Sequence, residues 1–464
     1  MYFEKISTPG LGCFSHVIGC PVAGVMAVVD PRRDVGVYLR IAEKNGMRVT
    51  HIFDTHVHAD HVSGALELRA ATGADIYIHE SAPVAYEAKK LKDGDEFRFG
   101  RAVLRALHTP GHTPNSVSFL AADLDRSPEP QMILTGDLLF VGDVGRPDLP
   151  GDELLEEQTE NLYNSLYKIL GALPDCLEVH PSHGQGSLCG SGMSEKPFST
   201  LGYERLANPM LRYPDFASFK QAILSKAPMR PQSFSAIIRA NMNGAAPAPG
   251  RADSALTPEK TDELRRDGAA LLDLRDAFSF ATAYIPGSVN VDFSGGPRLN
   301  WVGAAVAPDS RLALILPSDD GFEDMRTELR RIGYDGVEGW LRGGVRAWID
   351  SGRGTESLPY LSVSELRVRL AGPNPPALLD VRGPEEFNGG RIDGAVNHTF
   401  EMIMRGDACP AGADTEAVVV CQSGFRAGVA ASMLKARGLA NISVLAGGMD
   451  AWRNTAGDER QCLM

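Results

Sequence analysis

A run of ligating side chains between Thr55 and His61 constrains this chain more than any other feature of its sequence. The run reads Thr-His-Val-His-Ala-Asp-His, so three imidazoles and one carboxylate lie close together. Apolar residues precede it, which predicts a loop at the end of a buried strand. Alternate residues of an extended segment point the same way, so we expect His56, His58 and Asp60 to converge. Imidazole and carboxylate groups together favour a transition-metal site.

Three further candidate ligands stand in later loops, each after an apolar, strand-like segment. They are His112 after residues 103–108, Asp137 after residues 132–134, and His183 after residues 176–179. Each lies in a turn marked by Gly or Pro, which is typical of a loop that follows a strand. Ten of the eleven histidines precede residue 184, so we expect the metal chemistry in the first half of the chain.

The His-x-His-x-Asp-His run with its later His, Asp and His closely resembles the metallo-β-lactamase superfamily. The resemblance implies an αββα sandwich with a metal at one edge, and two branches of the superfamily compete. Glyoxalase II-like thioesterases would hold two metals, here zinc, with all seven groups. Persulfide dioxygenases would hold one Fe(II) with three of them, and the other four would orient ligands and water or hold a second metal. The implied iron ligands are His56, His112 and Asp137, and the other four are His58, Asp60, His61 and His183.

The segment after Asp137 favours the dioxygenase branch. Residues 145–148 read Gly-Arg-Pro-Asp, which resembles the Gly-Arg-x-Asp that follows the metal aspartate in that branch. Arg146 is a candidate to bind the anionic part of a thiol carrier, unless it forms a structural ion pair with Asp148 or Asp143. Cys189 lies in a loop that begins beside His183, so it is a second substrate-side candidate that could contact sulfane sulfur.

An internal repeat fills the second half of the chain. Three blocks recur in the same order: residues 270–275 match 377–382, residues 285–290 match 392–397, and residues 343–348 match 447–452. Such matched blocks indicate a duplication. Each unit begins with a short apolar strand and contains amphipathic helical stretches, which predicts a parallel sheet with helices on both faces.

Both repeats resemble the rhodanese family, and the second has that family's cysteine loop. The loop runs Cys421-Gln422-Ser423-Gly424-Phe425-Arg426. A thiol between a strand end and a helix N-terminus faces backbone N–H groups that stabilise anionic sulfur. We therefore expect Cys421 and Arg426 to be catalytic, and Gln422, Ser423 and Gly424 to bind substrate.

The first repeat departs from this pattern. Aligning Gly321-Phe322 with Gly424-Phe425 puts Ser318 opposite Cys421 and Glu323 opposite Arg426. The thiol is missing and the cation has become an anion, so we expect this repeat to be catalytically inactive.

These observations predict an α/β chain of three domains. They are an N-terminal αββα metallo-β-lactamase sandwich at 1–243, a degenerate rhodanese-like domain without the catalytic cysteine at 255–355, and an active rhodanese domain at 360–464. The resemblances imply a bifunctional enzyme that oxidises a thiol persulfide with O₂ to sulfite at one Fe(II) per chain. It would also transfer sulfane sulfur through Cys421 to or from sulfite and thiosulfate. The alternatives are a dinuclear zinc thioester hydrolase of the glyoxalase II kind with an accessory sulfurtransferase, and a non-enzymatic sulfur-relay module with a structural metal.

The composition limits the classes of binding partner and the cellular compartment that we expect. The formal charge of −13 disfavours nucleic acid and anionic membranes as partners. Seven widely spaced cysteines argue against a disulfide framework. The N-terminus has no signal-peptide pattern. We therefore expect a cytoplasmic enzyme acting on small molecules, assembled as a homodimer or homotetramer.

Overall fold

The structure is a computed structural model that describes residues 1–190, 192–225, 229–245, 254–294, 298–412 and 415–461. It divides into two compact units, one formed mainly by residues 1–249 and the other by most of residues 250–464. The segment between the first two predicted domains lies largely outside the described residues. No helix within the described ranges is long and apolar enough to cross a membrane.

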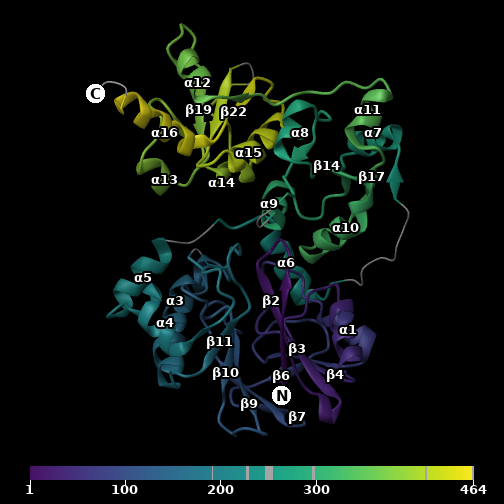
Figure 1. The fold of residues 1–464 in the computed structure, drawn as a ribbon, viewed down its shortest axis with the longest axis vertical. Helices are drawn as coiled ribbons and strands as arrows, with labels where there is room; N and C mark the ends of the chain where they lie inside the picture. The colour runs from purple at the N-terminus through teal and green to yellow at the C-terminus, as the bar shows by residue number, and fades with distance from the viewer. Residues whose placement is uncertain (191, 226–228, 246–253, 295–297, 413–414, 462–464) are drawn as a thin grey trace. The chain divides into compact units, whose positions relative to one another are not determined.

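The N-terminal unit contains two six-stranded mixed sheets (Figure 1). The first runs in chain order through β1 (Tyr2–Thr8), β2 (Cys13–Cys20), β3 (Val25–Val29), β4 (Arg48–Phe53), β5 (Asp75–His79) and β6 (Lys89–Leu91). The second has the order β12-β11-β10-β9-β8-β7, from β7 (Glu96–Phe99), β8 (Ala102–His108), β9 (Val117–Asp123) and β10 (Met132–Gly136) to β11 (Glu178–Pro181) and β12 (Ser199–Thr200).

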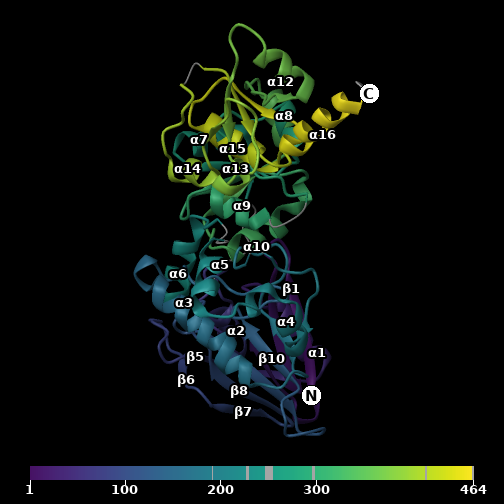
Figure 2. The same ribbon diagram turned by 90° about the vertical axis from the view of Figure 1, so that its left-hand side faces the viewer.

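Helices cover the outer faces of both sheets, which confirms the predicted αββα sandwich (Figure 2). The first sheet carries α1 (Gly36–Lys44) and α2 (Ala65–Thr72), and the second carries α3 (Leu155–Asn164), α4 (Leu201–Ala207) and α5 (Phe216–Ser225). The last helix of the unit, α6 (Ser233–Asn243), packs Phe234 against Ala59 of the metal-ligand loop.

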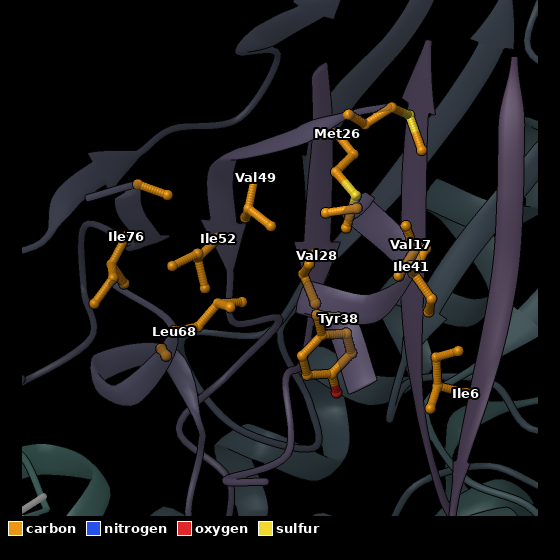
Figure 3. Close-up of a cluster of buried hydrophobic side chains, with 14 residues drawn as sticks. Ile6, Val17, Met26, Val28, Tyr38, Ile41, Val49, Ile52, Leu68 and Ile76 are labelled. Carbon is orange, nitrogen blue, oxygen red and sulfur yellow. The ribbon is translucent and has the colours of Figure 1, made fainter. Parts of the chain in front are cut away.

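Alternation along the strands produces this layering, because successive side chains of a strand point to opposite faces. Val28 faces the helices and packs in a cluster with Tyr38 of α1 (Figure 3). Its neighbour Val29 faces the other way, into the cluster that contains Phe119 of the second sheet. Burying both faces fixes the strand register, and with it the places where the loops leave each sheet.

The C-terminal unit contains two five-stranded parallel sheets with the same strand order. One is β13-β17-β16-β14-β15, from β13 (Ala255–Leu256), β14 (Ala270–Asp273), β15 (Val289–Asn290), β16 (Leu312–Ile315) and β17 (Val337–Leu341). The other is β18-β22-β21-β19-β20, from β18 (Tyr360–Leu361), β19 (Ala377–Asp380), β20 (Val396–Asn397), β21 (Ala417–Val420) and β22 (Ile442–Leu445). This shared topology agrees with the duplication that the sequence indicates.

Within the described residues, five α-helices accompany each parallel sheet. The first set is α7 (Pro258–Arg266), α8 (Ala277–Thr282), α9 (Arg298–Ala305), α10 (Phe322–Arg331) and α11 (Gly344–Asp350). The second set is α12 (Val363–Leu370), α13 (Pro384–Asn388), α14 (Phe400–Arg405), α15 (Phe425–Ala436) and α16 (Gly448–Gln461).

The core between the two sheets of the N-terminal unit gives a stability prediction. Leu104 is fully buried there, whereas Leu206 on α4 is 73% exposed. We expect Leu104→Ala to destabilise the unit by about 3 kcal/mol, because it leaves a cavity between the sheets. Differential scanning calorimetry should show the unit's transition roughly 10 °C lower. Leu206→Ala is the control and should leave the transition unchanged; an equal effect of both substitutions would contradict the assigned core.

Candidate metal centre and cysteine loop

Three side chains from three strand ends meet at one edge of the sandwich. His56 follows β4, His112 follows β8 and Asp137 follows β10, and each is at most 2% exposed. Asp137 Oδ2 lies 3.3 Å from His112 Nε2 and 3.9 Å from His56 Nε2. One nitrogen from each ring and one carboxylate oxygen therefore face a common point, which is the arrangement that a cation needs.

The hydrogen bonds behind these side chains leave the facing atoms without partners. His112 Nδ1 donates to the carbonyl oxygen of Arg146 at 2.7 Å, so its Nε2 presents a lone pair. Among the described residues, His56 Nε2, His112 Nε2 and Asp137 Oδ2 are all buried atoms with no hydrogen-bond partner. Unpaired buried polar atoms are costly, and three that face one another fit a metal ion.

The hydroxyl group of Thr55 orients the His56 ring in the same way. Thr55 Oγ1 donates to Asp30 Oδ2 at 3.0 Å, so at 2.9 Å it accepts the proton of His56 Nδ1. Burial, followed by the nearby His58 ring, holds the pKa of His56 well below its usual value. The ring is therefore neutral, as a metal ligand must be.

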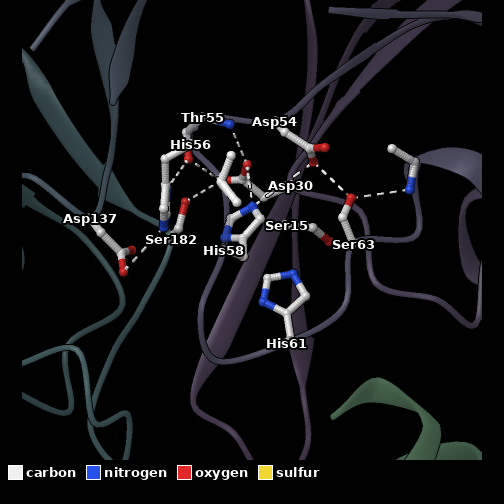
Figure 4. A network of polar contacts seen from close by, with 12 residues as sticks. Ser15, Asp30, Asp54, Thr55, His56, His58, His61, Ser63, Asp137 and Ser182 are labelled. Carbon is white, nitrogen blue, oxygen red and sulfur yellow. Dashed lines mark hydrogen bonds and ion pairs between the residues drawn. The ribbon is translucent and has the colours of Figure 1, made fainter. Parts of the chain in front are cut away.

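His58 does not join these three side chains, contrary to the expected convergence of His56, His58 and Asp60. His58 Nε2 lies 3.1 Å from Asp30 Oδ1 and 3.9 Å from Asp54 Oδ1 (Figure 4), whereas its Nδ1 is a buried atom without a hydrogen-bond partner. Residues 54–62 form an irregular loop rather than an extended segment, so alternate side chains do not share a direction. The convergence prediction was wrong for this reason.

Asp30 is a central residue that the sequence reasoning missed. Its carboxylate accepts hydrogen bonds from the Thr55 backbone N–H at 2.7 Å, from Thr55 Oγ1 at 3.0 Å and from Ser182 Oγ at 2.5 Å, besides facing His58 (Figure 4). Burial alone would raise the pKa of Asp30, but His58 and the hydrogen bonds hold it below its usual range. A signal existed, because Asp30 directly follows the apolar strand β3, as Asp137 follows β10.

Asp60, His61 and His183 form a second cluster, in which the polar groups pair with one another. His183 Nε2 lies 2.8 Å from Asp60 Oδ2, and His61 Nδ1 lies 3.3 Å from Asp60 Oδ1. Cys13 Sγ donates to Asp60 Oδ2 at 2.9 Å. His183 Nδ1 lies 2.5 Å from Asp137 Oδ1, which links this cluster to the first. A second cation would have to displace these hydrogen bonds.

The structure also places the two predicted substrate-side residues. Arg146 is buried and forms two hydrogen bonds of 2.6 Å with Asp148, the ion pair that was the alternative to carrier binding. Cys189 is 1% exposed and lies within reach of Asp137 and His183. Burial raises the pKa of the Cys189 thiol well above its usual value.

A small cavity adjoins the loops that carry His56 and His112. Its volume is about 260 Å³, and its lining includes Val57, Ala59, Thr113, Asn115, Leu149 and Met242. Every residue that lines it is uncharged. The cavity can receive a small and largely apolar group next to these two loops.

In the second rhodanese-like domain, Cys421 follows β21 and is 1% exposed. The backbone N–H of Gly424 donates to Cys421 Sγ at 3.1 Å. Gly424 has φ of 100°, a left-handed conformation that glycine adopts without strain, and it precedes helix α15. The sulfur therefore lies at a tight turn into a helix N-terminus, where backbone dipoles favour negative charge.

The other loop residues are placed as follows. Arg426 forms two hydrogen bonds with Glu386, at 2.6 and 2.8 Å. Gln422 Oε1 accepts from Arg382 Nη1 at 3.3 Å, and its amide nitrogen bonds Asp450. Ser423 is exposed. Only Gly424 among these residues has a described hydrogen bond to the sulfur.

The first rhodanese-like domain has no thiol at the matching place. Asp273 pairs with Ile315 as Asp380 pairs with Val420, so Leu316 occupies the position of Cys421. Counting back from the helix had put Ser318 there; the loop before α10 is two residues longer than the loop before α15, which explains the difference.

Comparison with known proteins matches three parts of the chain to two families. Residues 23–175 match the metallo-beta-lactamase superfamily, and residues 257–351 and 362–455 each match the rhodanese-like domain. A solved metallo-beta-lactamase from Staphylococcus aureus covers 74% of this chain and 99% of its own, with a TM-score of 0.66 and 28% identity.

Relatives of both candidate branches match the N-terminal part. A hydroxyacylglutathione hydrolase of Methylococcus capsulatus is 36% identical over 172 residues, which are 37% of this chain and 61% of that protein. This chain thus spans less than two thirds of that relative's length. The mitochondrial persulfide dioxygenase of Homo sapiens is 28% identical over 211 residues, which are 45% of this chain and 74% of that protein. Similarity alone therefore does not choose between the branches.

His56, His112 and Asp137 present atoms without hydrogen-bond partners, whereas Asp60, His61 and His183 pair with one another. This difference predicts how substitutions affect the metal content. We expect about one ion per chain, lost with His112→Ala but retained with His58→Ala, because His58 lies outside the group formed by His56, His112 and Asp137 and turns its Nε2 toward Asp30 and Asp54. Inductively coupled plasma mass spectrometry of the purified variants measures this. Two ions per chain, with a loss in His58→Ala, would indicate the dinuclear arrangement instead.

The Asp30 carboxylate gives a second prediction for this site. Asp30→Asn places an amide where Thr55, Ser182 and His58 need acceptor atoms, so the Thr55 hydroxyl would lose its orientation toward His56. Substitutions of residues that orient metal ligands typically weaken metal binding about 10- to 100-fold. Competition with a chelator measures the affinity. Asp75→Asn, at a surface ion pair in the same unit, is the control and should bind as the parent does.

Proposed function

Since the chain belongs to the metallo-beta-lactamase superfamily through residues 23–175 and carries two rhodanese-like domains, we propose that it is a persulfide dioxygenase fused to a sulfurtransferase. The N-terminal domain would catalyse R–S–SH + O₂ + H₂O → R–SH + SO₃²⁻ + 2H⁺. The C-terminal domain would transfer sulfane sulfur through a persulfide of Cys421, to sulfite or from thiosulfate.

The observation that carries the first half is the set of three unpaired atoms on His56, His112 and Asp137. Two imidazoles and one carboxylate on one side of a ferrous ion are the ligand set of non-haem iron oxygenases, which leaves other positions open for substrates. Bound there, Fe(II) would supply the activation of O₂ and a place for the persulfide sulfur. The pairing of Asp60, His61 and His183 with one another supports one metal rather than two.

The residues of this chain would hold and shield the reacting groups. The Arg146 carbonyl fixes the His112 ring, and Arg146 itself is held by Asp148, so this segment positions a ligand. Because its guanidinium is taken up by that ion pair, we assign Arg146 to positioning rather than to carrier binding. The uncharged cavity beside Val57 and Thr113 would receive the carbon chain of the thiol carrier.

Cys189 is the candidate for contact with the sulfane sulfur. It lies beside Asp137 and His183, and its burial keeps the sulfur as a neutral thiol that can donate a hydrogen bond. Replacement by Ser would keep a donor, so oxygen uptake in Cys189→Ser compared with Cys189→Ala separates hydrogen bonding from sulfur chemistry.

The proposed sulfur transfer rests on the contact between Gly424 N–H and Cys421 Sγ at the start of α15. In the transfer Cys–S–S⁻ + SO₃²⁻ → Cys–S⁻ + S₂O₃²⁻, one negative charge is on the outer persulfide sulfur before the transfer and on Cys421 Sγ after it. Backbone N–H groups and the helix N-terminus stabilise that charge. The covalent fusion raises the concentration of shared sulfur species at both sites.

A dinuclear zinc thioester hydrolase with an accessory sulfurtransferase is the second candidate. It is favoured by the similarity to hydroxyacylglutathione hydrolases and by the presence of all seven candidate ligands. It requires Asp60, His61 and His183 to leave their present partners, whereas His58 Nδ1 is a buried atom without a hydrogen-bond partner.

Oxygen uptake separates the candidates. The parent and Cys421→Ser, both loaded anaerobically with Fe(II), should consume oxygen when given a thiol persulfide. Sulfite should accumulate in Cys421→Ser, whereas the parent should convert it to thiosulfate. Loading with zinc instead, and assaying thioester hydrolysis, is the control for the alternative. If protein verified to hold iron consumes no oxygen, the dioxygenase proposal is wrong.

A further inference from the structure

The rhodanese-like domain without a cysteine contacts the helix that carries the cysteine loop of the other. Helix α15 is buried from Ala427 through Leu434. A helix that is buried along all its sides needs cover on more than one face. Its neighbours are β21, β22 and α14 of its own domain, together with β15 and α9 of the domain that lacks the thiol.

One of these contacts gives a backbone N–H of an edge strand a hydrogen-bond partner. β15 is the last strand of its sheet, so one side of its backbone has no strand partner. The backbone N–H of Asn290 in β15 donates to Ser432 Oγ of α15 at 3.0 Å. Ser432 is fully buried, so this hydrogen bond ties the middle of α15 to the first repeat.

The second contact lies at the end of α15 next to Cys421. The indole ring of Trp301, on α9, lies 5.5 Å from the Phe425 ring at an interplanar angle of 68°, and 5.1 Å from the Phe400 ring at 85°. Both are edge-to-face arrangements, which hold aromatic rings in defined orientations. Phe425 is the first residue of α15, and the preceding Gly424 is the residue whose N–H contacts Cys421 Sγ.

We propose that Trp301 is a positioning residue for Cys421: by holding Phe425, it fixes the start of α15 and the direction of the backbone N–H groups that face the sulfur. The repeat that lost its thiol would thus be retained because it completes the catalytic loop of its duplicate. This proposal rests on the proposed sulfur transfer at Cys421.

The chain offers a matched control within the same domain. Trp340 stacks on Phe322, with ring centroids 4.4 Å apart, and Phe322 is the first residue of α10. α10 is the counterpart of α15 in the inactive repeat. Trp340→Ala therefore removes an indole from the equivalent helix start, but at the loop without a thiol.

The experiment compares Trp301→Ala, Trp301→Phe and Trp340→Ala in the full-length protein. Two quantities are measured: kcat and KM for sulfur transfer from thiosulfate to cyanide, and the rate of Cys421 alkylation by iodoacetamide at pH 7, followed by peptide mass spectrometry. Tyr360 and Arg426, the ionisable groups whose charges interact with Cys421, are unchanged in all variants.

We expect Trp301→Ala to lower kcat and the alkylation rate about tenfold with little change in KM, because a small misplacement of a catalytic group costs rate rather than binding. Trp301→Phe keeps a ring and should stay within about twofold of the parent, as should Trp340→Ala. Oxygen uptake at the N-terminal domain should be unchanged in all three.

Two results would overturn the proposal: Trp301→Ala with both rates like the parent, or an equal loss in Trp340→Ala. If Trp301→Ala lacks the calorimetric transition of the C-terminal unit, Trp301→Leu, which keeps apolar bulk without a ring, is judged by the same two rates. A parent without sulfur transfer would refute the proposed function, whereas the alkylation rates would still decide whether Trp301 positions Cys421.

Discussion

The buried carboxylate of Asp30 is the interaction on which the arrangement of the metal centre depends. It stands at the end of β3 and accepts hydrogen bonds from Thr55 of the ligand loop and from Ser182 next to His183, while it also faces His58. A buried charge is tolerated only when it is paired and hydrogen-bonded, so its neighbours are held firmly. Asp30 thereby orients the loop that carries His56 and joins it to the loop that carries His183.

The hydrogen bonds divide the seven candidate ligands into side chains that pair with other protein groups and side chains that present an atom without a partner. His56, His112 and Asp137 each present an atom without a partner, whereas Asp60, His61 and His183 pair with one another and with Cys13. His58 combines both features, because its Nε2 faces Asp30 and Asp54 while its buried Nδ1 has no hydrogen-bond partner. The same seven residues can thus serve a centre with one metal ion or a centre with two. The hydrogen-bond partners of each side chain favour one of these two centres over the other.

The two rhodanese-like domains of the C-terminal unit share one topology but differ in the loop that holds Cys421 in the second. Both sheets have the same strand order, and the strand register is preserved up to Ile315 and Val420. The following loop is two residues longer in the first repeat, with Leu316 where the second has Cys421. The first repeat nevertheless covers the part of α15 that faces β15 and α9, and this helix is buried along its length.

The sequence by itself determined the architecture and the chemical types at the sites. The ligand motif, through its resemblance to the metallo-β-lactamase superfamily, implied the layered sandwich. Repeated blocks predicted two related parallel sheets, and Cys421 at a strand end predicted an anion-binding turn. The sandwich and the two parallel sheets are confirmed, because motifs, repeated blocks and strand ends can be recognised locally in the chain.

Only the tertiary structure decided which side chains meet. The partners of His58, the contact of Cys13 with Asp60, the role of Asp30 and the approach of Trp301 to Phe425 join residues that are far apart in the sequence. Residues 54–62 form an irregular loop, so the direction of each side chain is set by its hydrogen-bond partners rather than by a period. Such contacts follow from packing two sheets and two repeats together, which no short sequence pattern encodes.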